Sequence, residues 1–271
     1  MNPILAGILI AVGVIVLLFF FLIITYRPKK AKFAPFYGKN FAHRGLYEKD
    51  QSIPENSLAA FDRACEHGYG MELDVQLSKD GQVVVFHDDT LTRMCGVDRR
   101  VDELDFSELR ELRLKGTDQH IPLFTEVLSA VRGRTPVIVE LKDGRNNNEL
   151  CQKTLDLIKA YGGSFCIESF NPLIVAWFRF HAHHIVRGQL SQQPEIYKKG
   201  ALMRVILGCT LLNFAARPHF IAYRIGRKPF PVKLAELSGA KKVAWTSHSA
   251  DTEKDFDVVI FEHYLPEIKY K

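Results

Sequence analysis

The chain has 271 residues, a length that suits one large domain. Hydrophobic residues make up 47% of it and charged residues 25%, which excludes a disordered, collagen-like or low-complexity chain because there is enough apolar material to bury a core. The net charge of +5 comes entirely from residues 27–39, whereas residues 40–271 carry 31 basic and 31 acidic side chains, so the composition argues against nucleic-acid binding.

Residues 3–25 form a run without a charged or amide side chain. At 1.5 Å per residue, this run is long enough to cross a hydrocarbon core of about 30 Å. A cleaved signal sequence would have a basic start, a shorter apolar core and a small-residue cleavage site, none of which is present, so we expect an uncleaved anchor. The basic run 27–32 follows it, which predicts a cytoplasmic location for the large domain and attraction to anionic headgroups. We divide the chain into an anchor (1–26), a basic juxtamembrane linker (27–39) and one large domain (40–271).

Short β-branched or aromatic runs alternate with longer helical patterns from Phe41 onward. The predicted strands are 41–43, 71–77, 83–87, 136–141, 165–169, 185–190, 220–223, 241–246 and 258–261. The predicted helices are 57–67 with Asn56 as its cap, 106–111 after Asp105, 123–131, 149–161, 172–180 and 202–214. This alternation predicts an α/β fold, a distorted (β/α)8 TIM barrel preceded by one transmembrane helix, with a doubly wound open sheet as the alternative.

The strands 71–77 and 83–87 are joined by only five residues. Parallel strands need a crossover of a dozen or more residues, so we expect an antiparallel hairpin. A turn near Asp80 and Gly81 would place His87 opposite Asp74, with Glu72 on the same face. These three side chains are therefore expected to converge.

Three acids, Glu72, Asp74 and Glu140, lie in apolar strands. Buried carboxylates repel one another and require a positive partner. A set of hard oxygen ligands suits Mg²⁺ or Ca²⁺ better than Zn²⁺, which prefers histidine and cysteine. The pattern predicts a divalent-metal site, and the simpler alternative is a set of surface acids. The five cysteines include no close pair, so we expect free thiols.

Two histidines follow predicted strands, His43 after the first and His87 after the hairpin. Such a pair can act as the acid and base that hydrolyse a phosphodiester. Arg44 offers a planar fork of donors for the phosphate. Lys142 offers a second cation, although an exposed lysine at a strand end is an equally good interpretation.

Several motifs occur in a fixed order along the chain: His43-Arg44-Gly45, Pro54-Glu55-Asn56-Ser57, Glu72-Leu73-Asp74-Val75, Val84-Val85-Phe86-His87-Asp88, Leu91-Thr92-Arg93, Ile121-Pro122-Leu123 and Glu140-Leu141-Lys142. On these residues the chain closely resembles the glycerophosphodiester phosphodiesterases, densely over residues 41–142 and more thinly to the end. The resemblance implies a distorted TIM barrel, Ca²⁺ or Mg²⁺, and hydrolysis of glycerophosphodiesters to glycerol 3-phosphate and an alcohol.

Carried over to the matching positions, the resemblance implies an acid–base pair of His43 and His87. It likewise implies metal ligation by Glu72, Asp74 and Glu140. Glu55 lies near the metal by the same resemblance, as a ligand or as a partner that orients Arg44, and we expect the second role.

The chain departs from the family pattern after Trp245, where the segment to Asp257 leaves little or no room for a helix before the last strand. This shortening bears on how the barrel closes. Glu262 and His263 replace the usual Thr-Asp ending, and His248 is expected to be an exposed loop residue. These changes concern headgroup preference rather than the metal and the histidines.

The sequence therefore predicts a membrane-anchored, metal-dependent phosphodiesterase that acts on small or lipid-derived glycerophosphodiesters at a lipid bilayer. A lysophospholipase D or a cyclising phospholipase of related barrel type is a second hypothesis. A catalytically weak anchored barrel that binds anionic lipid is a third, although the retained histidines and acids argue against it.

Overall fold

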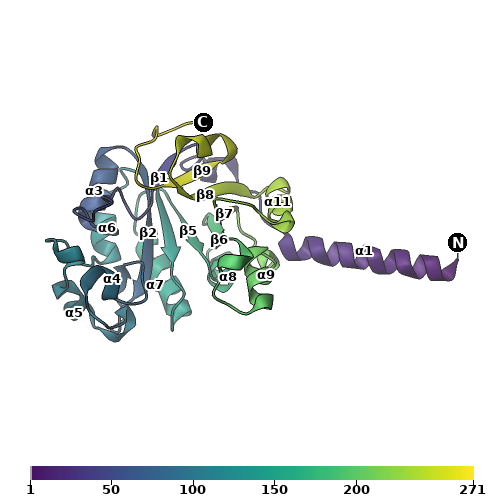
Figure 1. The fold of residues 1–271 in the computed structure, drawn as a ribbon, viewed down its shortest axis with the longest axis horizontal. Helices are drawn as coiled ribbons and strands as arrows, with labels where there is room; N and C mark the ends of the chain where they lie inside the picture. The colour runs from purple at the N-terminus through teal and green to yellow at the C-terminus, as the bar shows by residue number, and fades with distance from the viewer. Residues whose placement is uncertain (1) are drawn as a thin grey trace.

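Nine strands form in the computed structural model, which describes residues 2–271, and the nine predicted strands are confirmed within one or two residues at most ends. Eight of them are parallel and close a barrel, because β1 pairs with both β2 and β9 (Figure 1). The ninth, β3, is an antiparallel addition on β2. The strands are β1 (Asn40–Ala42), β2 (Gly70–Leu77), β3 (Val83–Val85), β4 (Val137–Leu141), β5 (Phe165–Ser169), β6 (Arg187–Ser191), β7 (Phe220–Arg224), β8 (Lys241–Ser247) and β9 (Val258–Phe261).

Helices cover the outside of the barrel, and the chain order of strand and helix is that of a TIM barrel. The α-helices are α1 (Pro3–Ile23), α2 (Lys30–Phe33), α3 (Leu58–Glu66), α4 (Thr92–Cys95), α5 (Phe106–Glu111), α6 (Phe124–Val131), α7 (Asn147–Lys159), α8 (Pro172–His181), α9 (Ala201–Gly208), α10 (Asn213–Ala216) and α11 (Phe230–Leu237). Short 3-10 helices span Val101–Glu103, Leu114–Gly116, Pro194–Ile196 and Ala250–Asp255.

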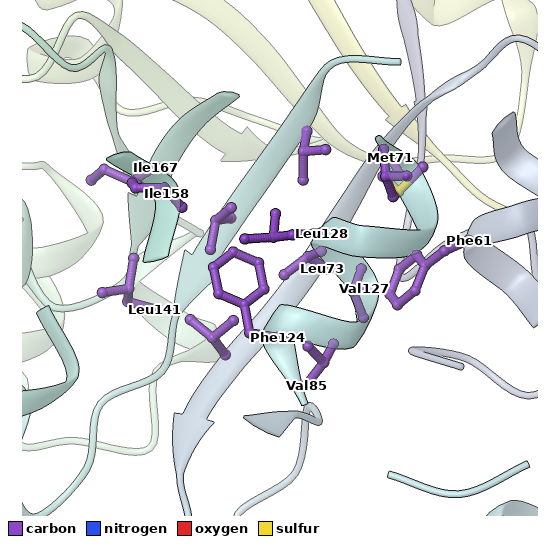
Figure 2. Close-up of a cluster of buried hydrophobic side chains, with 14 of the residues drawn as sticks. Phe61, Met71, Leu73, Val85, Phe124, Val127, Leu128, Leu141, Ile158 and Ile167 are labelled. Carbon is purple, nitrogen blue, oxygen red and sulfur yellow. The ribbon is translucent and has the colours of Figure 1, made fainter. Parts of the chain in front are cut away.

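Each barrel strand contributes side chains to two hydrophobic clusters, one outside the barrel and one inside it, because successive side chains of a strand point to opposite sides. Leu73 of β2 and Leu141 of β4 face outward and pack with Phe124 and Val127 of α6 (Figure 2). The inner cluster is formed by inward-facing apolar side chains of the barrel strands, including Phe41, Ile138, Cys166, Phe220, Val243 and Ile260. Glu72, Asp74 and Glu140 share the parity of this inner set and therefore point into the barrel.

Two helix predictions need correction. Ser57, not Asn56, caps α3, because its Oγ accepts a hydrogen bond from the Ala60 amide, whereas Asn56 has a positive φ of 55° and lies one residue outside the helix. The predicted helix 202–214 is two short helices, since α9 ends at Gly208 and Thr210 then adopts a φ of 52°. The sequence prediction also missed α11.

The predicted hairpin of β2 and β3 is confirmed, but its expected register is wrong by one residue. Phe86 donates its amide to the Asp74 carbonyl at 3.0 Å, so Phe86, rather than His87, lies opposite Asp74. The reason is the turn, which is centred on Asp80 because the Ser78 hydroxyl bonds both the Asp80 carboxylate and the Gln82 amide. His87 reaches the site from the loop that follows β3.

The barrel closes despite the short segment between β8 and β9. A 3-10 helix, Ala250–Asp255, replaces a full α-helix, and Val258 and Val259 still pair with β8. Phe261 pairs with Ala42 of β1. The barrel therefore closes, with a shift in the register between β8 and β9 that lies between Ala244 and Ser247.

The predicted linker 27–39 packs against the barrel instead of crossing free solvent. Phe33 and Phe36 are 3% and 2% exposed and belong to the inner cluster, where the ring of Phe36 stacks on that of Phe41 at 6.1 Å. The helix α1 extends away from the barrel (Figure 1), and in the described chain it is the one helix long and apolar enough to cross a membrane. Its last residue, Ile23, is buried on the barrel.

We predict that Phe36→Ala destabilises the full chain by about 3–5 kcal/mol, because it opens a cavity in the inner core. Denaturant unfolding of the protein in detergent measures the change. Tyr37→Ala is the matched control, since Tyr37 is 39% exposed, and it should cost about 1 kcal/mol or less. Equal losses in both variants would show that residues 33–36 do not belong to the barrel core.

Candidate active site

The predicted site residues come from strand ends at one mouth of the barrel. Glu72 and Asp74 lie on β2, and Glu140 lies beside Asp74 on β4. His43 follows β1 directly, at a position that continues the inward parity of Phe41. The carboxyl ends of parallel barrel strands meet at this mouth, where TIM-barrel active sites are found.

The three predicted metal ligands form a cluster. Each of Glu72, Asp74 and Glu140 offers a carboxylate oxygen, and these oxygens lie within 4.8 Å of one another. Burial raises the pKa of Glu72 well above its usual value, and the charges of Asp74 and Glu140 raise it further. The Asp74 Oδ1 atom accepts no hydrogen bond, although the Lys142 ammonium lies 3.3 Å from it. A buried donor set made only of carboxylate oxygens fits a hard divalent cation.

Two cations lie against this cluster. Lys142 Nζ is 2.8 Å from Glu140 and 3.3 Å from Asp74, and Arg44 Nε is 3.6 Å from Asp74. Burial would lower the pKa of Lys142, but the charges of Glu140 and Asp74 outweigh burial and raise it. Burial would likewise raise the pKa of Asp74, yet the charges of Lys142, His87 and Arg44 hold it well below its usual range. The Lys142 ammonium thus binds carboxylates here, and its contact with a phosphate stays a prediction.

The loop after β1 brings its backbone against the cluster. The Arg44 amide donates to Glu72 Oε2 at 3.0 Å, and both Arg44 and Gly45 have positive φ. A side chain at Gly45 would place its Cβ 2.9 Å from Ala60, so only glycine fits there. Asn56 donates its side-chain amide to Asp74 Oδ2 at 2.8 Å, a role that the sequence prediction missed by treating Asn56 as a helix cap.

A chain of ion pairs connects Arg44 to His87. Arg44 Nη1 bonds Glu55 at 2.7 Å, and Arg93 bonds the same carboxylate through two nitrogens at 2.9 and 2.6 Å. Arg93 Nε then bonds Asp88 at 2.6 Å, and Asp88 bonds His87 Nδ1 at 2.6 Å. The structure therefore places Glu55 as the partner that orients Arg44, outside the carboxylate cluster. The sequence prediction assigned no role to Asp88 or Arg93, although both belong to the motifs.

Glu262 is a site residue that the sequence prediction noted only as a departure. Its Oε2 lies 2.8 Å from His43 Nδ1 and accepts a hydrogen bond from the Tyr47 hydroxyl at 2.9 Å. Burial would raise the pKa of Glu262, but the hydrogen bond with His43 and the charges nearby lower it to about 2. His248 and His263 approach its other oxygen at 3.6 and 3.8 Å. Its position was the sequence signal that could have identified it, because it lies two residues beyond an inward-facing residue of the last strand.

His43 itself has a lowered pKa. Burial is the main cause and the neighbouring Arg44 charge adds to it, whereas Glu262 and Asp74 act in the opposite direction. The imidazole is therefore neutral at neutral pH. With Nδ1 directed at the Glu262 carboxylate, Nε2 is the nitrogen left to accept a proton.

Glu168, on β5 beside Glu140, is a fourth buried carboxyl that the sequence prediction missed. It is 1% exposed and its Oε2 has no hydrogen-bond partner. Burial raises its pKa well above the usual value, with a further contribution from Glu140 and Asp74. Like Glu140, it stands near the end of an apolar strand, and that position was the available signal.

The other half of the mouth is aromatic. Phe170, two residues beyond Glu168, makes an edge-to-face contact with Trp245 of β8 at 5.4 Å and with Tyr197 at 6.5 Å. Trp245 donates its indole N–H to the carbonyl of Ser191 at the end of β6. The mouth thus joins a charged half built on β1, β2, β4 and β9 to an aromatic half built on β5, β6 and β8.

The chain is similar to phosphodiesterases both in sequence and in structure. The sequence profile of the glycerophosphoryl diester phosphodiesterase family matches residues 43–259. The rat (Rattus norvegicus) lysophospholipase D GDPD1 is 36% identical over 151 residues, covering 51% of this chain and 45% of that protein. A glycerophosphodiester phosphodiesterase of Caldanaerobacter subterraneus subsp. tengcongensis is 33% identical over 162 residues, covering 56% of this chain and 65% of that protein.

Among solved structures, an Oleispira antarctica phosphodiesterase in complex with the product sn-glycerol-3-phosphate superimposes with a TM-score of 0.68. It shares 23% identity, and the match covers 83% of this chain and 93% of that chain. This likeness confirms the fold. The chain spans about half to two thirds of the length of the curated relatives described above.

We predict that Glu262→Gln lowers kcat by about 10- to 100-fold, the usual cost of losing a partner that orients a functional histidine. The acidic limb of the kcat/KM profile should also move to lower pH. The carboxylate favours the imidazolium of His43, so its removal lowers the pKa of His43 further and keeps the imidazole neutral in more acidic solution.

The pH profile of hydrolysis measures both effects, with Glu267→Gln, an exposed acid five residues further on, as the control. A wild-type rate and pH profile for Glu262→Gln would contradict this role.

Proposed function

The chain belongs to the glycerophosphoryl diester phosphodiesterase family, and on this premise we propose that it hydrolyses glycerophosphodiesters to glycerol 3-phosphate and an alcohol. The observation that carries the proposal is the buried cluster of Glu72, Asp74 and Glu140 at the mouth of the barrel, beside His43. Such a cluster is costly in a folded protein unless a cation meets it. A phosphodiester at this mouth would meet both positive charge and proton-transfer groups.

Glu72, Asp74 and Glu140 would hold one divalent cation, and their hard oxygen atoms suit Ca²⁺ or Mg²⁺. When bound, such an ion supplies Lewis-acid stabilisation of the charge on a phosphate oxygen. Asn56 and the Arg44 amide fix the carboxylates Asp74 and Glu72 by hydrogen bonds, so the donor set is held in place by the chain itself.

His43 acts as the general base in this proposal. It is neutral, its Nδ1 is held by Glu262, and its Nε2 can take a proton from the attacking hydroxyl. His87, held at Nδ1 by Asp88, then protonates the departing alkoxide. Each histidine is thereby oriented by its own carboxylate, which fixes the nitrogen that faces the substrate.

Arg44 would bind the phosphate with its guanidinium, and Lys142 would add a second positive charge after leaving the carboxylates. Glu55 holds Arg44 in position and is itself held by Arg93. Two routes are compatible with these residues: attack by water, or attack by the 2-hydroxyl of the substrate's own glycerol, which expels the alcohol and gives a cyclic phosphate that water then opens. A cyclic phosphate among the products would indicate the second route.

The substrate class that we favour is lipid-derived, including lysophospholipids. Three similar proteins bear the name lysophospholipase D GDPD1, and α1 offers a membrane anchor. The aromatic half of the mouth provides apolar surface on the side away from the charged groups. We further propose that the anchor is retained and that the catalytic domain is cytoplasmic, because the basic run follows α1. A cleaved signal sequence is the alternative for this helix.

We predict that, when Ca²⁺ or Mg²⁺ is present, the full chain in detergent releases glycerol 3-phosphate from a glycerophosphodiester, or acyl-glycerol 3-phosphate and the headgroup alcohol from a lysophospholipid, and that EDTA abolishes release. His43→Ala and His87→Ala should each lower kcat by about 10²- to 10⁴-fold, the range expected for loss of an acid or a base. His183→Ala, a loop histidine outside the site, is the control. No turnover of any substrate with either metal would favour an anchored lipid-binding barrel instead.

We also predict that Ca²⁺ or Mg²⁺ raises the apparent Tm of the wild-type protein by about 5–10 °C at a concentration of about 100 times Kd, which stabilises by about 2.7 kcal/mol. Glu72→Gln should lose most of this rise. Without metal it should melt at or above the wild-type temperature, because it removes one of the repelling carboxylates. Differential scanning fluorimetry measures the shift, and the exposed Glu108→Gln should behave as wild type. A full metal-dependent rise in Glu72→Gln would contradict the assignment.

A further inference from the structure

One region of the barrel differs sharply in charge from the rest. Residues 196–235 carry eight basic side chains and no acid, whereas the remainder of residues 40–271 carries 23 basic and 31 acidic side chains. This region includes α9, α10, β7 and most of α11. The domain therefore contains a strongly basic segment, although its net charge as a whole is zero.

The same region exposes large apolar side chains. Leu202, Met203 and Val205 of α9 are 73%, 42% and 48% exposed, and Phe230 at the start of α11 is 68% exposed. A barrel helix normally turns such residues toward the strands. We call these four residues and Ile225 the α9–α11 surface. Basic side chains border it, at Lys198, Lys199, Arg204, Arg224 and Arg227.

Hydrogen bonds join the elements that carry this surface. Gln193, in the loop before α9, donates its side-chain amide to the carbonyl of Arg224, next to Ile225. Tyr223 of β7 donates its hydroxyl to the carbonyl of Gly208 at the end of α9. The β7–α11 loop and α9 are thus neighbours, although some 20 residues separate them in the chain.

The helix α1 is seated on the same side of the barrel. Ile23 and Phe19 pack with Ile221, Val232 and Leu211, and α9 and α11 lie on the side from which α1 extends (Figure 1). The Tyr26 amide then donates to the carbonyl of Pro218 at 2.9 Å. The exit of the anchor is therefore fixed to the barrel by packing and by a hydrogen bond.

The length of α1 leaves little distance between the barrel and a membrane. Its 21 residues span about 31 Å, and a hydrocarbon core is about 30 Å thick. Residues 19–23 already contact the barrel. A helix that both crosses the bilayer and keeps these contacts must therefore draw the adjoining barrel surface to the hydrocarbon boundary.

From these observations we propose that the α9–α11 surface rests on the anionic leaflet from which α1 enters the membrane, with Leu202, Met203 and Val205 inserted among the lipids and the bordering lysines and arginines on the headgroups. Apolar side chains flanked by basic ones are typical of helices that lie in a membrane interface. This inference rests on the membrane anchoring given under the proposed function.

The placement has a consequence for substrate access. The carbonyl of Leu207, near the end of α9, accepts a hydrogen bond from Ser191 at the mouth end of β6. The Tyr197 hydroxyl also bonds Ser191, and Tyr197 contacts Phe170 in the aromatic half of the mouth. Contacts through Leu207, Ser191 and Tyr197 thus link the end of α9 to the aromatic half of the mouth. On this placement, a single-chain lipid would pass from the leaflet over α9 and Tyr197 to the mouth.

The experiment uses the full chain in phosphatidylcholine nanodiscs, with and without phosphatidylserine. Leu202→Trp should be quenched by lipids brominated near the headgroup end of the acyl chain, and more strongly with phosphatidylserine present. Leu265→Trp is the matched control, because Leu265 is 62% exposed but lies after β9, outside the α9–α11 surface. Quenching of Leu202→Trp no greater than that of Leu265→Trp would overturn the proposal.

A second arm measures access. Leu202→Glu combined with Val205→Glu should lower hydrolysis of a lysophospholipid in the nanodisc by about tenfold, because two apolar side chains lose their contact with lipid. Hydrolysis of a water-soluble glycerophosphodiester should not change, and Leu265→Glu should alter neither rate. Equal losses on both substrates, or none, would refute access through α9. If the wild-type chain hydrolysed neither substrate, the proposed function would fail, while the quenching result would still decide where the surface lies.

Discussion

Buried negative charge at the mouth of the barrel is the constraint on which the site depends. Glu72, Asp74 and Glu140 are 2%, 1% and 7% exposed. Each buried charge costs several kcal/mol, whereas a whole domain is stable by only about 5–15 kcal/mol. The neighbours must therefore supply positive charge or hydrogen bonds, and Lys142 and Arg44 do so. The divalent cation that we propose would complete the compensation and make the same cluster useful for phosphodiester chemistry.

Much of the fold and of the candidate site could be predicted from the sequence, because the two-residue period of a strand determines which residues share a face. Glu72 and Asp74 differ by two positions, and Glu140 ends a similar apolar strand, so their convergence follows once the strands form one barrel. The short connection between β2 and β3 likewise allows only a hairpin. These features depend on local pattern and on chain length, and both are visible in a single sequence.

The remaining features depend on contacts between distant segments. Glu262 lies 219 positions from His43, and only closure of the barrel brings them together. Asparagine is a common helix-capping residue, but the side chain of Asn56 donates to Asp74, and Ser57 caps α3 instead. The burial of Phe36 and the exposure of Leu202 also have no local signal, since each depends on what the rest of the chain places beside it.

The most direct test of the central claim is a crystal of the protein soaked with Mn²⁺, with anomalous diffraction measured at the manganese edge. Mn²⁺ takes the same carboxylate ligands as Mg²⁺ and Ca²⁺. We predict an anomalous peak bounded by Glu72, Asp74 and Glu140, with the Lys142 ammonium displaced from Asp74. The absence of a peak there, with Lys142 still bound to both Glu140 and Asp74, would contradict it.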